Sequence, residues 1–292
     1  MQLLSLANVT KTFGKFKAVD DVSFNLNSGE IFGFIGPNGA GKSTTIRMII
    51  GALNKSSGKI YVDNLDIDTH PKYIENISYV PGDVNLWGNL TGMEIINFFM
   101  AQRHFTDKEE RDRLIKVFKL DANKKSKTYS KGNRQKVALI SALLSDADIL
   151  IFDEPTTGLD PLMERVFHNE LIKKKNQGKS VVLSSHILSE VEKLADRIAI
   201  IKDGKIIESG KLSELRHITR TKYLIQAEND LSFLKNYDFV HDFEVDQGVT
   251  VILVDNDHIK DFFKRIRTSE ITHLATEPLS LESIFLRYYE DS

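Results

Sequence analysis

The feature that most limits what this chain can fold into is a glycine-rich stretch between an apolar run and an amphipathic one. The stretch fits the pattern GxxxxGK[ST] and consists of Gly36, Pro37, Asn38, Gly39, Ala40, Gly41, Lys42, Ser43 and Thr44. Residues 31–35 before it predict a buried strand, and the apolar residues after it have the spacing of one helix face: Ile46, Ile49, Ile50 and Leu53. Glycines allow successive backbone amides to surround phosphate oxygens at the start of a helix. A phosphate-binding loop is therefore expected here.

The residue types in and beyond this loop suit phosphate chemistry. Lys42 can supply a charge to the β- and γ-phosphates of a nucleotide, and the Ser43 hydroxyl can ligate Mg²⁺. The apolar run 149–152 predicts a second buried strand, which ends in Asp153 and Glu154. On a parallel sheet the carboxyl end of a strand faces the ligand crevice. We therefore expect Asp153 to hold Mg²⁺ and Glu154 to orient and deprotonate a water molecule.

The order of predicted elements indicates two domains. In 1–215, strands alternate with helices, which predicts an α/β fold with a parallel sheet and a helical block at about 83–146. Residues 216–292 carry a net charge of −5, whereas 1–215 carry +3. Their elements follow the order βαββαβ plus a helix, which predicts a small α+β domain of the ferredoxin-like type. The expected strands are 223–227, 239–245, 249–254 and 271–276, and the expected helices are 231–236, 258–267 and 279–289.

Composition excludes several classes of function. The chain has 292 residues and no cysteine, so disulfides, thiolate metal sites and a cysteine nucleophile are excluded. A formal net charge of −2 gives no broad electrostatic footprint for nucleic acid. No apolar run approaches the roughly 18 residues that span a bilayer. We expect a cytosolic chain that serves a membrane, if at all, through a partner.

Five motifs in a fixed order resemble those of ABC-type ATPases, and the resemblance covers 1–215. In addition to the phosphate loop, the motif residues are an aromatic at Phe13, a signature at Ser130, Lys131, Gly132 and Asn133, the strand end with its D-loop at Asp153, Glu154 and Asp160, and a switch histidine at His186. In that family the aromatic stacks on adenine and the signature contacts the γ-phosphate from another chain. The tail resembles, more loosely, the accessory domain of drug and antibiotic exporters.

The resemblance implies a fold, an activity and a set of partners. The fold would be a P-loop ATPase core with antiparallel N-terminal strands and a helical subdomain. Lys42, Glu154 and His186 would act in ATP hydrolysis, with Ser43 and Asp153 holding Mg²⁺. The chain would form a homodimer, or a heterodimer with a second ATPase subunit, in which each ATP lies between two chains. Integral membrane permease subunits would form the pore, and the chain would lie peripherally at the inner face of the cell membrane.

Alternatives remain open at this point. An ABC-type ATPase without a pore would carry the same motifs, and a small-molecule P-loop kinase would share the loop but not Ser130 or His186. Phe13 is either an adenine-stacking residue or a core aromatic. Trp87 lies where the family forms the groove for its membrane partner, but it could equally be buried in the helical block.

Two departures from the family pattern matter. The signature reads Ser-Lys-Gly-Asn in place of Ser-Gly-Gly-Gln. Gly82 stands where the family usually has a glutamine that senses Mg²⁺ and water, and Asp83 is its nearest replacement. A one-residue offset in an extended segment reverses the side-chain direction. We therefore expect water, rather than Asp83, to take the place of the missing ligand.

Overall fold

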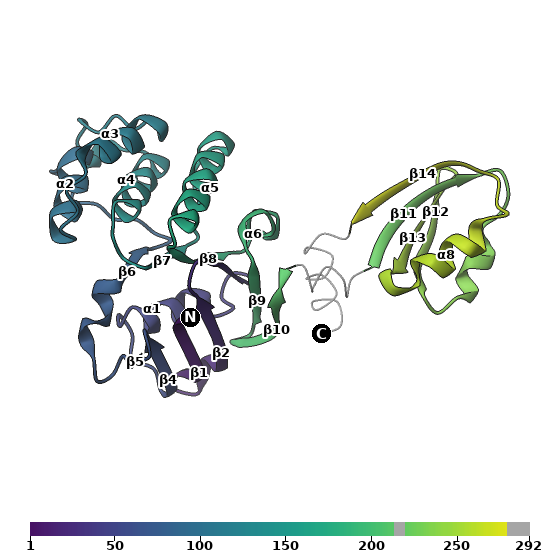
Figure 1. The fold of residues 1–292 in the computed structure, drawn as a ribbon, viewed down its shortest axis with the longest axis horizontal. Helices are drawn as coiled ribbons and strands as arrows, with labels where there is room; N and C mark the ends of the chain where they lie inside the picture. The colour runs from purple at the N-terminus through teal and green to yellow at the C-terminus, as the bar shows by residue number, and fades with distance from the viewer. Residues whose placement is uncertain (213–219, 279–292) are drawn as a thin grey trace. The chain divides into compact units, whose positions relative to one another are not determined.

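The computed structural model describes residues 1–212 and 220–278, and the chain divides into two compact units, Met1–Ser209 and Gly210–Ser292 (Figure 1). The predicted boundary, between 215 and 216, lies outside the described residues. Each unit has its own hydrophobic core. The two units are described separately below.

A six-stranded sheet forms the centre of the first unit. Its order is β10-β9-β3-β8-β7-β6, and β9, β3, β8, β7 and β6 run parallel to one another. Every residue of β3, β7 and β8 is buried, as continuous apolar runs in a covered parallel sheet should be. The strand bounds are β3 Ile31–Ile35, β6 Ile77–Val80, β7 Ile149–Asp153, β8 Ser180–Ser185, β9 Arg197–Lys202 and β10 Lys205–Lys211.

An antiparallel sheet packs against the central one and confirms the expected N-terminal strands. Its order is β2-β1-β4-β5, with bounds β1 Gln2–Phe13, β2 Phe16–Asn27, β4 Ser57–Val62 and β5 Leu65–Asp66. Phe24 of β2 stacks on Phe32 of β3 with 4.8 Å between ring centroids. The helix α1, Lys42–Ile49, contributes Ile46, Met48 and Ile49 to the same core. Strands β1, β2, β3 and β4 and the helix α1 therefore share one core, and the phosphate loop connects β3 to α1 at its edge.

The helix α1 is shorter than its apolar spacing predicts. It ends at Ile49, whereas the predicted face continues to Leu53. Gly51 has a φ of 72°, a left-handed conformation that terminates helices. Ile50 and Leu53 still pack against the core from outside the helix. The spacing thus identified buried residues correctly but placed the helix end too late.

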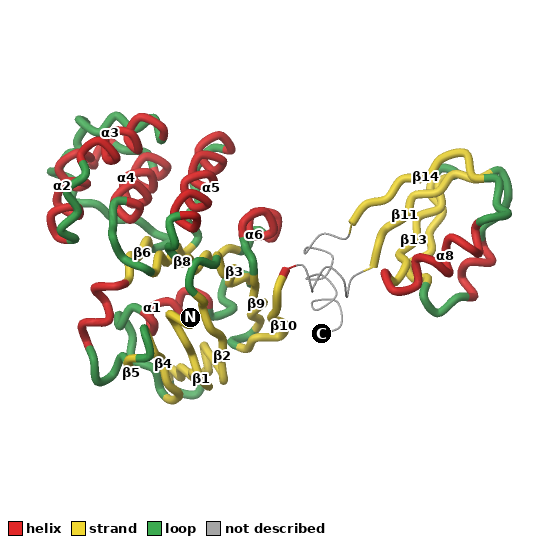
Figure 2. The backbone as a smooth tube through the Cα atoms, in the orientation of Figure 1, coloured by secondary structure: helices red, strands yellow, loops and turns green. Residues whose placement is uncertain are grey.

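A helical block interrupts the α/β alternation, as expected. It contains α2 Gly92–Gln102, α3 Lys108–Val117 and α4 Lys131–Leu143, which group together beside α5 Pro161–Asn176 (Figures 1 and 2). The capping box of Thr91 and Glu94 begins α2, and Asp107 caps α3. The 3₁₀ turns η1 Pro71–Asn76 and η2 Ser126–Thr128 and the short helix α6 Leu188–Leu194 complete the unit.

The second unit confirms the ferredoxin-like prediction. Its antiparallel sheet has the order β12-β13-β11-β14, with β11 Arg220–Ala227, β12 Val240–Asp246, β13 Val249–Asp255 and β14 Ile271–Pro278. The second predicted helix is observed as η4 Asn256–His258 followed by α8 Ile259–Ile266. The first predicted helix is only a 3₁₀ turn, η3 Ser232–Asn236. The expected final helix, 279–289, lies outside the described residues.

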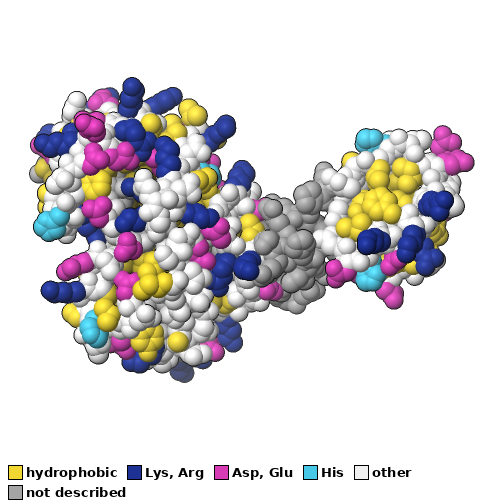
Figure 3. Space-filling model, viewed as in Figure 1, with side chains coloured by type: hydrophobic (Ala, Val, Ile, Leu, Met, Phe, Trp, Pro, Cys, Tyr) yellow, Lys and Arg dark blue, Asp and Glu magenta, His cyan; other side chains and the backbone are white. Residues whose placement is uncertain are grey.

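Charged side chains of both signs are interspersed over the face of the first unit that Figure 3 shows. Such a mixture does not concentrate positive charge in one place on this face, which is what a polyanion would need. In residues 1–212 and 220–278, no helix combines the length and the apolar character needed to cross a bilayer.

Candidate nucleotide site

The phosphate loop connects β3 to α1, and its backbone can be made only with glycine at two positions. A Cβ on Gly36 would lie 2.3 Å from the carbonyl oxygen of Ile201. Gly41 has a φ of 109°, and a Cβ there would lie 2.6 Å from the carbonyl oxygen of Ala18. The loop therefore packs closely against the backbones of β2 and β9. The glycines of the motif therefore serve close packing as well as backbone freedom.

The start of α1 is arranged for an anion. Gly41 is its N-cap residue and has no side chain to satisfy the first amides, and no acidic residue occurs in the first turn. A helix start of this kind presents unpaired N–H groups and the positive end of the helix dipole. Lys42 is buried, and its Nζ donates hydrogen bonds to the carbonyl oxygens of Gly36 at 2.6 Å and Pro37 at 3.1 Å. The lysine is folded back over the loop whose phosphate it would serve.

Glu154 lies between Lys42 and His186. Its Oε1 is 3.1 Å from Lys42 Nζ, and its Oε2 is 2.5 Å from His186 Nδ1. The contact with Lys42 is an ion pair without hydrogen-bond alignment, so the buried Oε1 accepts no hydrogen bond. Glu154 also has a φ of 49°, a strained conformation for a residue with a side chain. The backbone of Glu154 is thus strained, and one oxygen of its carboxylate accepts no hydrogen bond.

Adjacent strands explain why these residues meet. Strands β7 and β8 are parallel neighbours, and Asp153 at the end of β7 is in register with Ser184 in β8. Glu154 and His186 follow these strand ends directly, although they are 32 residues apart in the sequence. His186 remains substantially exposed, with 42% of its side-chain surface accessible, whereas Glu154 is mostly buried. The histidine can therefore contact a ligand while it holds the carboxylate.

Asp153 is suited to a hard cation. It is 3% exposed, and Ser184 Oγ donates a hydrogen bond of 2.5 Å to its Oδ1. No lysine, arginine or histidine of the described residues forms an ion pair with it. Within the same residues, no group of three or more acidic, histidine or cysteine side chains could hold a metal ion alone. Mg²⁺ in nucleotide sites usually takes one or two protein oxygens together with phosphate oxygens and water, which fits this donor set.

The signature residues form a second surface at the start of α4. Ser130 is the N-cap residue, and its Oγ accepts a 3.3 Å hydrogen bond from the Asn133 amide. A Cβ on Gly132 would lie 2.5 Å from the carbonyl oxygen of Gly158, so only glycine fits. The side chain of Lys131 covers Gly158. Asp160 caps α5 by accepting a hydrogen bond from the Met163 amide. One concave surface is lined by Ser130, Gly132, Asn133, Lys136, Gly158, Leu159 and Asp160.

The structure does not join the signature surface to the phosphate loop. In the described part of the chain, no hydrogen bond or ion pair links 130–133 to 36–44. One connection reaches the segment after β7 instead, because Gln135 Nε2 donates to the carbonyl oxygen of Pro155 at 2.9 Å. The sequence motifs thus form two separate groups, one around the phosphate loop and one at the start of α4.

Phe13 is not a core residue, so that alternative is wrong. Half of its surface is exposed, and the Nζ of Lys11 lies 4.9 Å from its ring centroid. Phe13 pairs with Phe16 in the hairpin of β1 and β2. Strand β2 also supplies Ala18, whose carbonyl oxygen packs against Gly41. The exposed ring therefore belongs to a hairpin that adjoins the phosphate loop.

Position 82 adjoins the catalytic strand end. A Cβ on Gly82 would lie 3.2 Å from the Asp153 carbonyl oxygen and 3.5 Å from the Cβ of Glu154. Asp83 is exposed, and its Oδ2 accepts one long hydrogen bond, 3.5 Å, from Asn85. Whether Asp83 or water takes the place of the missing glutamine stays a prediction.

Trp87 is also exposed, which excludes the alternative of burial in the helical block. Its accessible fraction is 49%, and its ring packs edge-to-face against the half-exposed Phe98 at 5.3 Å. Phe99 contacts both rings. An exposed aromatic cluster of this kind marks a surface for another protein more often than a solvated face.

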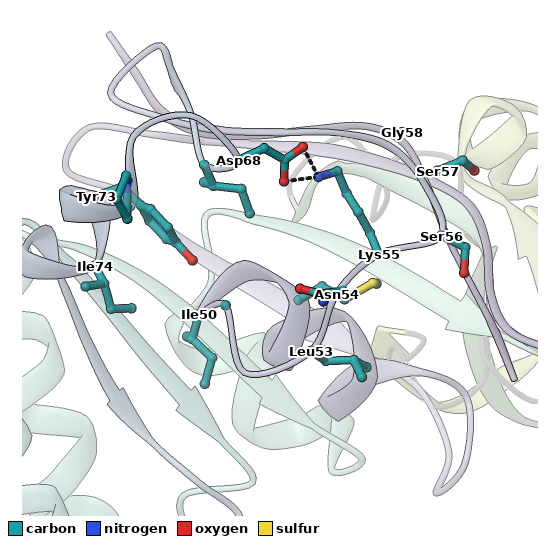
Figure 4. Close-up of a pocket in the computed structure, with 14 residues that line it drawn as sticks. Ile50, Leu53, Asn54, Lys55, Ser56, Ser57, Gly58, Asp68, Tyr73 and Ile74 are labelled. Atoms are coloured by element: carbon teal, nitrogen blue, oxygen red, sulfur yellow. Dashed lines mark hydrogen bonds and ion pairs between the residues drawn. The ribbon is translucent and has the colours of Figure 1, made fainter.

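A separate pocket of about 690 Å³ is lined by none of the residues predicted for the nucleotide site (Figure 4). Ile50, Leu53 and Ile74 give it an apolar lining, and Lys55 pairs with Asp68 across it. Burial raises the pKa of the Tyr73 hydroxyl, which favours the neutral phenol. Its lining includes Asp68, Ser56 and Ser57, but none of the residues predicted for the nucleotide site. The phosphate loop, Asp153, Glu154 and His186 lie elsewhere, at or directly after the carboxyl ends of β3, β7 and β8.

Several residues of the site escaped sequence reasoning. Gln135, Thr156 and Ser184 lie in or beside the motifs of the resemblance, which gives them no role of their own, and no motif includes Glu190. All four are buried polar residues. Their signal in the sequence is weak because a buried polar side chain inside a helix or strand cannot be distinguished from an exposed one without the fold.

Comparisons with known proteins agree with this geometry. The family model for ABC transporter proteins matches residues 19–157. The ABC transporter ATP-binding protein YhcH of Bacillus subtilis is 37% identical over 82% of this chain and 80% of its own length. YhaQ of the same organism is 32% identical over 97% of both chains. The bacitracin transport ATP-binding protein BcrA of Bacillus licheniformis is 36% identical over 84% of this chain and 82% of its own.

Solved structures give the same result. A structure of the ATP-binding subunit of an ABC transporter has a TM-score of 0.67 and 31% identity, and covers 73% of this chain and 92% of its own. A dimeric MJ0796 cassette in a post-hydrolysis state with ADP and Pi has a TM-score of 0.64 and 30% identity, covering 72% and 99%.

Fold and site together define an ATP-binding, ATP-hydrolysing protein of the ABC type. The relatives then specify the family, because the chain covers most of the length of several members at more than 30% identity. The chain belongs to the ABC transporter family, as an ATP-binding subunit. These comparisons do not favour the alternative of an ABC-type ATPase without a transport role.

Proposed function

We propose that Lys42, Glu154 and His186 carry out ATP hydrolysis in this subunit, and that the subunit powers an exporter. The observation that carries the catalytic part is the arrangement of Glu154 between Lys42 Nζ and His186 Nδ1 with Oε1 free of hydrogen bonds. A buried carboxylate oxygen that accepts no hydrogen bond can accept a proton from a water molecule. Its partner histidine fixes the other oxygen.

ATP binding would begin with Lys42. Its ammonium group now donates to two backbone carbonyls, which are weaker partners than a phosphate oxygen. We propose that the nucleotide phosphates draw Lys42 outwards and occupy the amides at the start of α1. Phe13 would stack on the adenine. Release of Lys42 from Glu154 leaves the carboxylate free to act on water.

Ser43 and Asp153 would hold Mg²⁺ with the nucleotide phosphates. The bound ion would neutralise part of the phosphate charge during phosphoryl transfer. The protein's own contribution is to orient Asp153 through Ser184 and to keep the carboxylate buried.

The signature surface would complete the site of a second chain. Ser130, Lys131, Gly132 and Asn133 form a helix start that makes no contact with the phosphate loop of its own chain. A dimeric MJ0796 cassette shows that related subunits pair. We propose a homodimer, or a heterodimer with another ATPase subunit, in which α4 of each chain faces the ATP of its partner. Asp160 would lie at the same interface.

The proposed membrane partners are permease subunits, with this chain at the cytoplasmic face. The solved CbiO1 relative, 25% identical, is described as part of the complex cbiONQ. In this chain the cluster of Trp87, Phe98 and Phe99 would receive the permease. Relatives named for bacitracin and multidrug transport favour export as the direction.

The test of the catalytic proposal compares Glu154→Gln with His186→Ala. Glu154→Gln should retain ATP binding and lose about 10²–10⁴-fold in turnover, since it keeps the shape but cannot accept the proton. ATP and Mg²⁺ should then give a stable dimer in size-exclusion chromatography. His186→Ala should also lose turnover with ATP binding retained. Undiminished hydrolysis by Glu154→Gln would remove the residue from this role.

A further inference from the structure

A buried carboxylate behind the catalytic pair has no role in the function proposed so far. Glu190 lies in α6 and is 7% exposed. Its Oε2 accepts hydrogen bonds from Thr156 Oγ1 at 3.0 Å and from Ser185 Oγ at 3.3 Å. No lysine, arginine or histidine within residues 1–212 and 220–278 forms an ion pair with it. The carboxylate is thus held by two hydroxyl groups alone.

The two hydroxyl groups belong to the segments that carry the catalytic pair. Thr156 lies two residues after Glu154, and Ser185 directly precedes His186. Ser185 Oγ also accepts a 2.9 Å hydrogen bond from the Ile187 amide, which fixes the turn around the histidine. One oxygen of Glu190 therefore connects the end of β7 with the end of β8, behind the Glu154–His186 contact.

Keeping a carboxylate at this position is costly. Burial raises the pKa of Glu190, and the nearby carboxylates Glu164 and Glu154 add to the shift. An apolar residue would pack there without that cost. Buried polar groups that weaken stability are expected where function requires them.

The strained backbone at Glu154 has to be held by contacts with neighbouring residues. A residue with a side chain stays at a φ of 49° only when its surroundings fix it there. The amide of Glu154 donates to the Ser184 carbonyl oxygen, and Gln135 holds the carbonyl of Pro155. Glu190 adds the next anchor, at Thr156. Three successive residues are thus tied to their neighbours.

We propose that Glu190 is a positioning residue that sets the distance between Glu154 and His186 by tying Thr156 to Ser185. This inference rests on the proposed roles of Glu154 and His186. It predicts that loss of Glu190 lets the two segments move independently. A displacement of about 1 Å at a reacting group can lower the rate on the order of 10²-fold.

The test uses the full chain with three substitutions. Glu190→Ala should lower kcat about 10- to 100-fold and change ATP affinity less than about twofold, because the phosphate loop is untouched. Glu190→Gln keeps an oxygen that accepts both hydroxyl groups, so it should recover most of kcat. Thr156→Val removes one donor without changing shape and should lose kcat in the same direction. Glu192→Gln, on the same helix, is the matched control for charge and should leave kcat unchanged.

A second readout separates positioning from general instability. The ring ¹⁵N signals of His186, assigned by their loss in His186→Ala, should shift in Glu190→Ala and stay unchanged in Glu192→Gln. Equal kcat for Glu190→Ala and Glu192→Gln would overturn the inference. It would also be overturned if Glu190→Ala lost kcat while the His186 signals stayed in place and Glu190→Gln failed to recover activity. If Glu190→Ala does not fold, Glu190→Gln and Thr156→Val provide the same comparison.

The same set distinguishes this inference from the function on which it rests. Full turnover by Glu154→Gln and His186→Ala would refute the proposed catalytic roles, whatever Glu190 does. If those two variants are inactive and Glu190→Ala is normal, only the positioning role fails.

Discussion

The two surfaces of the first unit that carry the motifs are built in opposite ways. At the phosphate loop, polar groups are left for a ligand: Glu154 Oε1 accepts no hydrogen bond, and Lys42 rests on backbone carbonyls. At the signature, the polar groups are already satisfied. Ser130 caps α4, and Asp160 caps α5. At the first surface Lys42 and Glu154 pair with each other and with backbone carbonyls or His186, whereas the second surface is a helix start whose N-cap is already formed.

This difference bears on how ATP would act between two chains. At the phosphate loop Lys42 can exchange backbone carbonyls for phosphate oxygens, which are stronger partners, so this surface would bind ATP first. At the start of α4, where Ser130 already forms the N-cap, an anion would interact only with the helix dipole and the first amides. Each of these interactions contributes little free energy. ATP bound by one chain would therefore become the anion that the signature of the next chain lacks.

The largest expected effect comes from dividing the two surfaces between chains. In a heterodimer of Lys42→Ala and Ser130→Arg chains, one composite site is intact if the surfaces are shared, and none is intact if each chain works alone. Either variant by itself should be nearly inactive. The mixture should recover turnover in proportion to heterodimer, measured by phosphate release.

Ser130→Thr is the control for this experiment, because threonine retains the hydroxyl that caps α4. It should mix with wild type without effect. No recovery in a mixture shown to contain heterodimer would contradict site sharing.

The next effect concerns the close contact between the signature and the D-loop. Gly132→Ala places a methyl group 2.5 Å from the carbonyl oxygen of Gly158, so the start of α4 or the loop has to move. We expect a loss of about 1–3 kcal/mol in unfolding free energy, as for overpacking elsewhere. Gly178→Ala provides a contrast, because its φ of 87° is strained but its Cβ would contact nothing. If the turnover per folded Gly132→Ala chain equals wild type, the contact matters only for stability.

Much of the first surface could be predicted from the sequence because its motifs are local. The phosphate loop with Gly36 and Gly41 is recognisable from a pattern only nine residues long. The helix after the loop was predicted too long because the left-handed turn at Gly51 outweighed the apolar spacing. The predicted helix at 231–236 shortened to a 3₁₀ turn, since six residues make few helical hydrogen bonds.

Contacts between distant segments could not be predicted in the same way. The register of β7 and β8 decides that Asp153 meets Ser184, and no local pattern encodes a register between strands 31 residues apart. Glu190 shows the same limit, because its partners, Thr156 after β7 and Ser185 at the end of β8, come together only through the sheet. The resemblance supplied His186, but the fold was needed to place it on Glu154.

A smaller effect is expected from the second unit, which has its own core of residues such as Tyr223 and Phe262. We predict that residues 216–292 contribute no group to the nucleotide. Deleting them should change ATP affinity, measured by calorimetry, by less than about threefold, which corresponds to under 1 kcal/mol. Dimer lifetime or partner coupling can fall independently. A truncated chain that is folded but fails to bind ATP would contradict the separation.

A modest effect is also expected at position 82, where the phosphate-loop surface lacks a ligand that the family normally provides. Gly82→Gln should raise Mg²⁺-dependent turnover or Mg²⁺ affinity of the isolated subunit by about two- to tenfold, since one ligand contact is worth on the order of 1 kcal/mol. The Cβ would lie 3.2 Å from the Asp153 carbonyl oxygen, so a shift of a few tenths of an ångström accommodates it. Asp83→Ala should be nearly silent because Asp83 is exposed and its one hydrogen bond is long.

Gly82→Ala separates the ligand from the backbone in this prediction. Alanine introduces the same Cβ and the same restriction of the chain without an oxygen, so it should not raise turnover. A gain in both Gly82→Ala and Gly82→Gln would assign the effect to backbone stiffness. Loss of Mg²⁺ dependence in a folded Asp83→Ala chain would show that Asp83 reaches the ion after all. The phosphate-loop surface would then lack no ligand, and its contrast with the signature would rest on Lys42 and Glu154 alone.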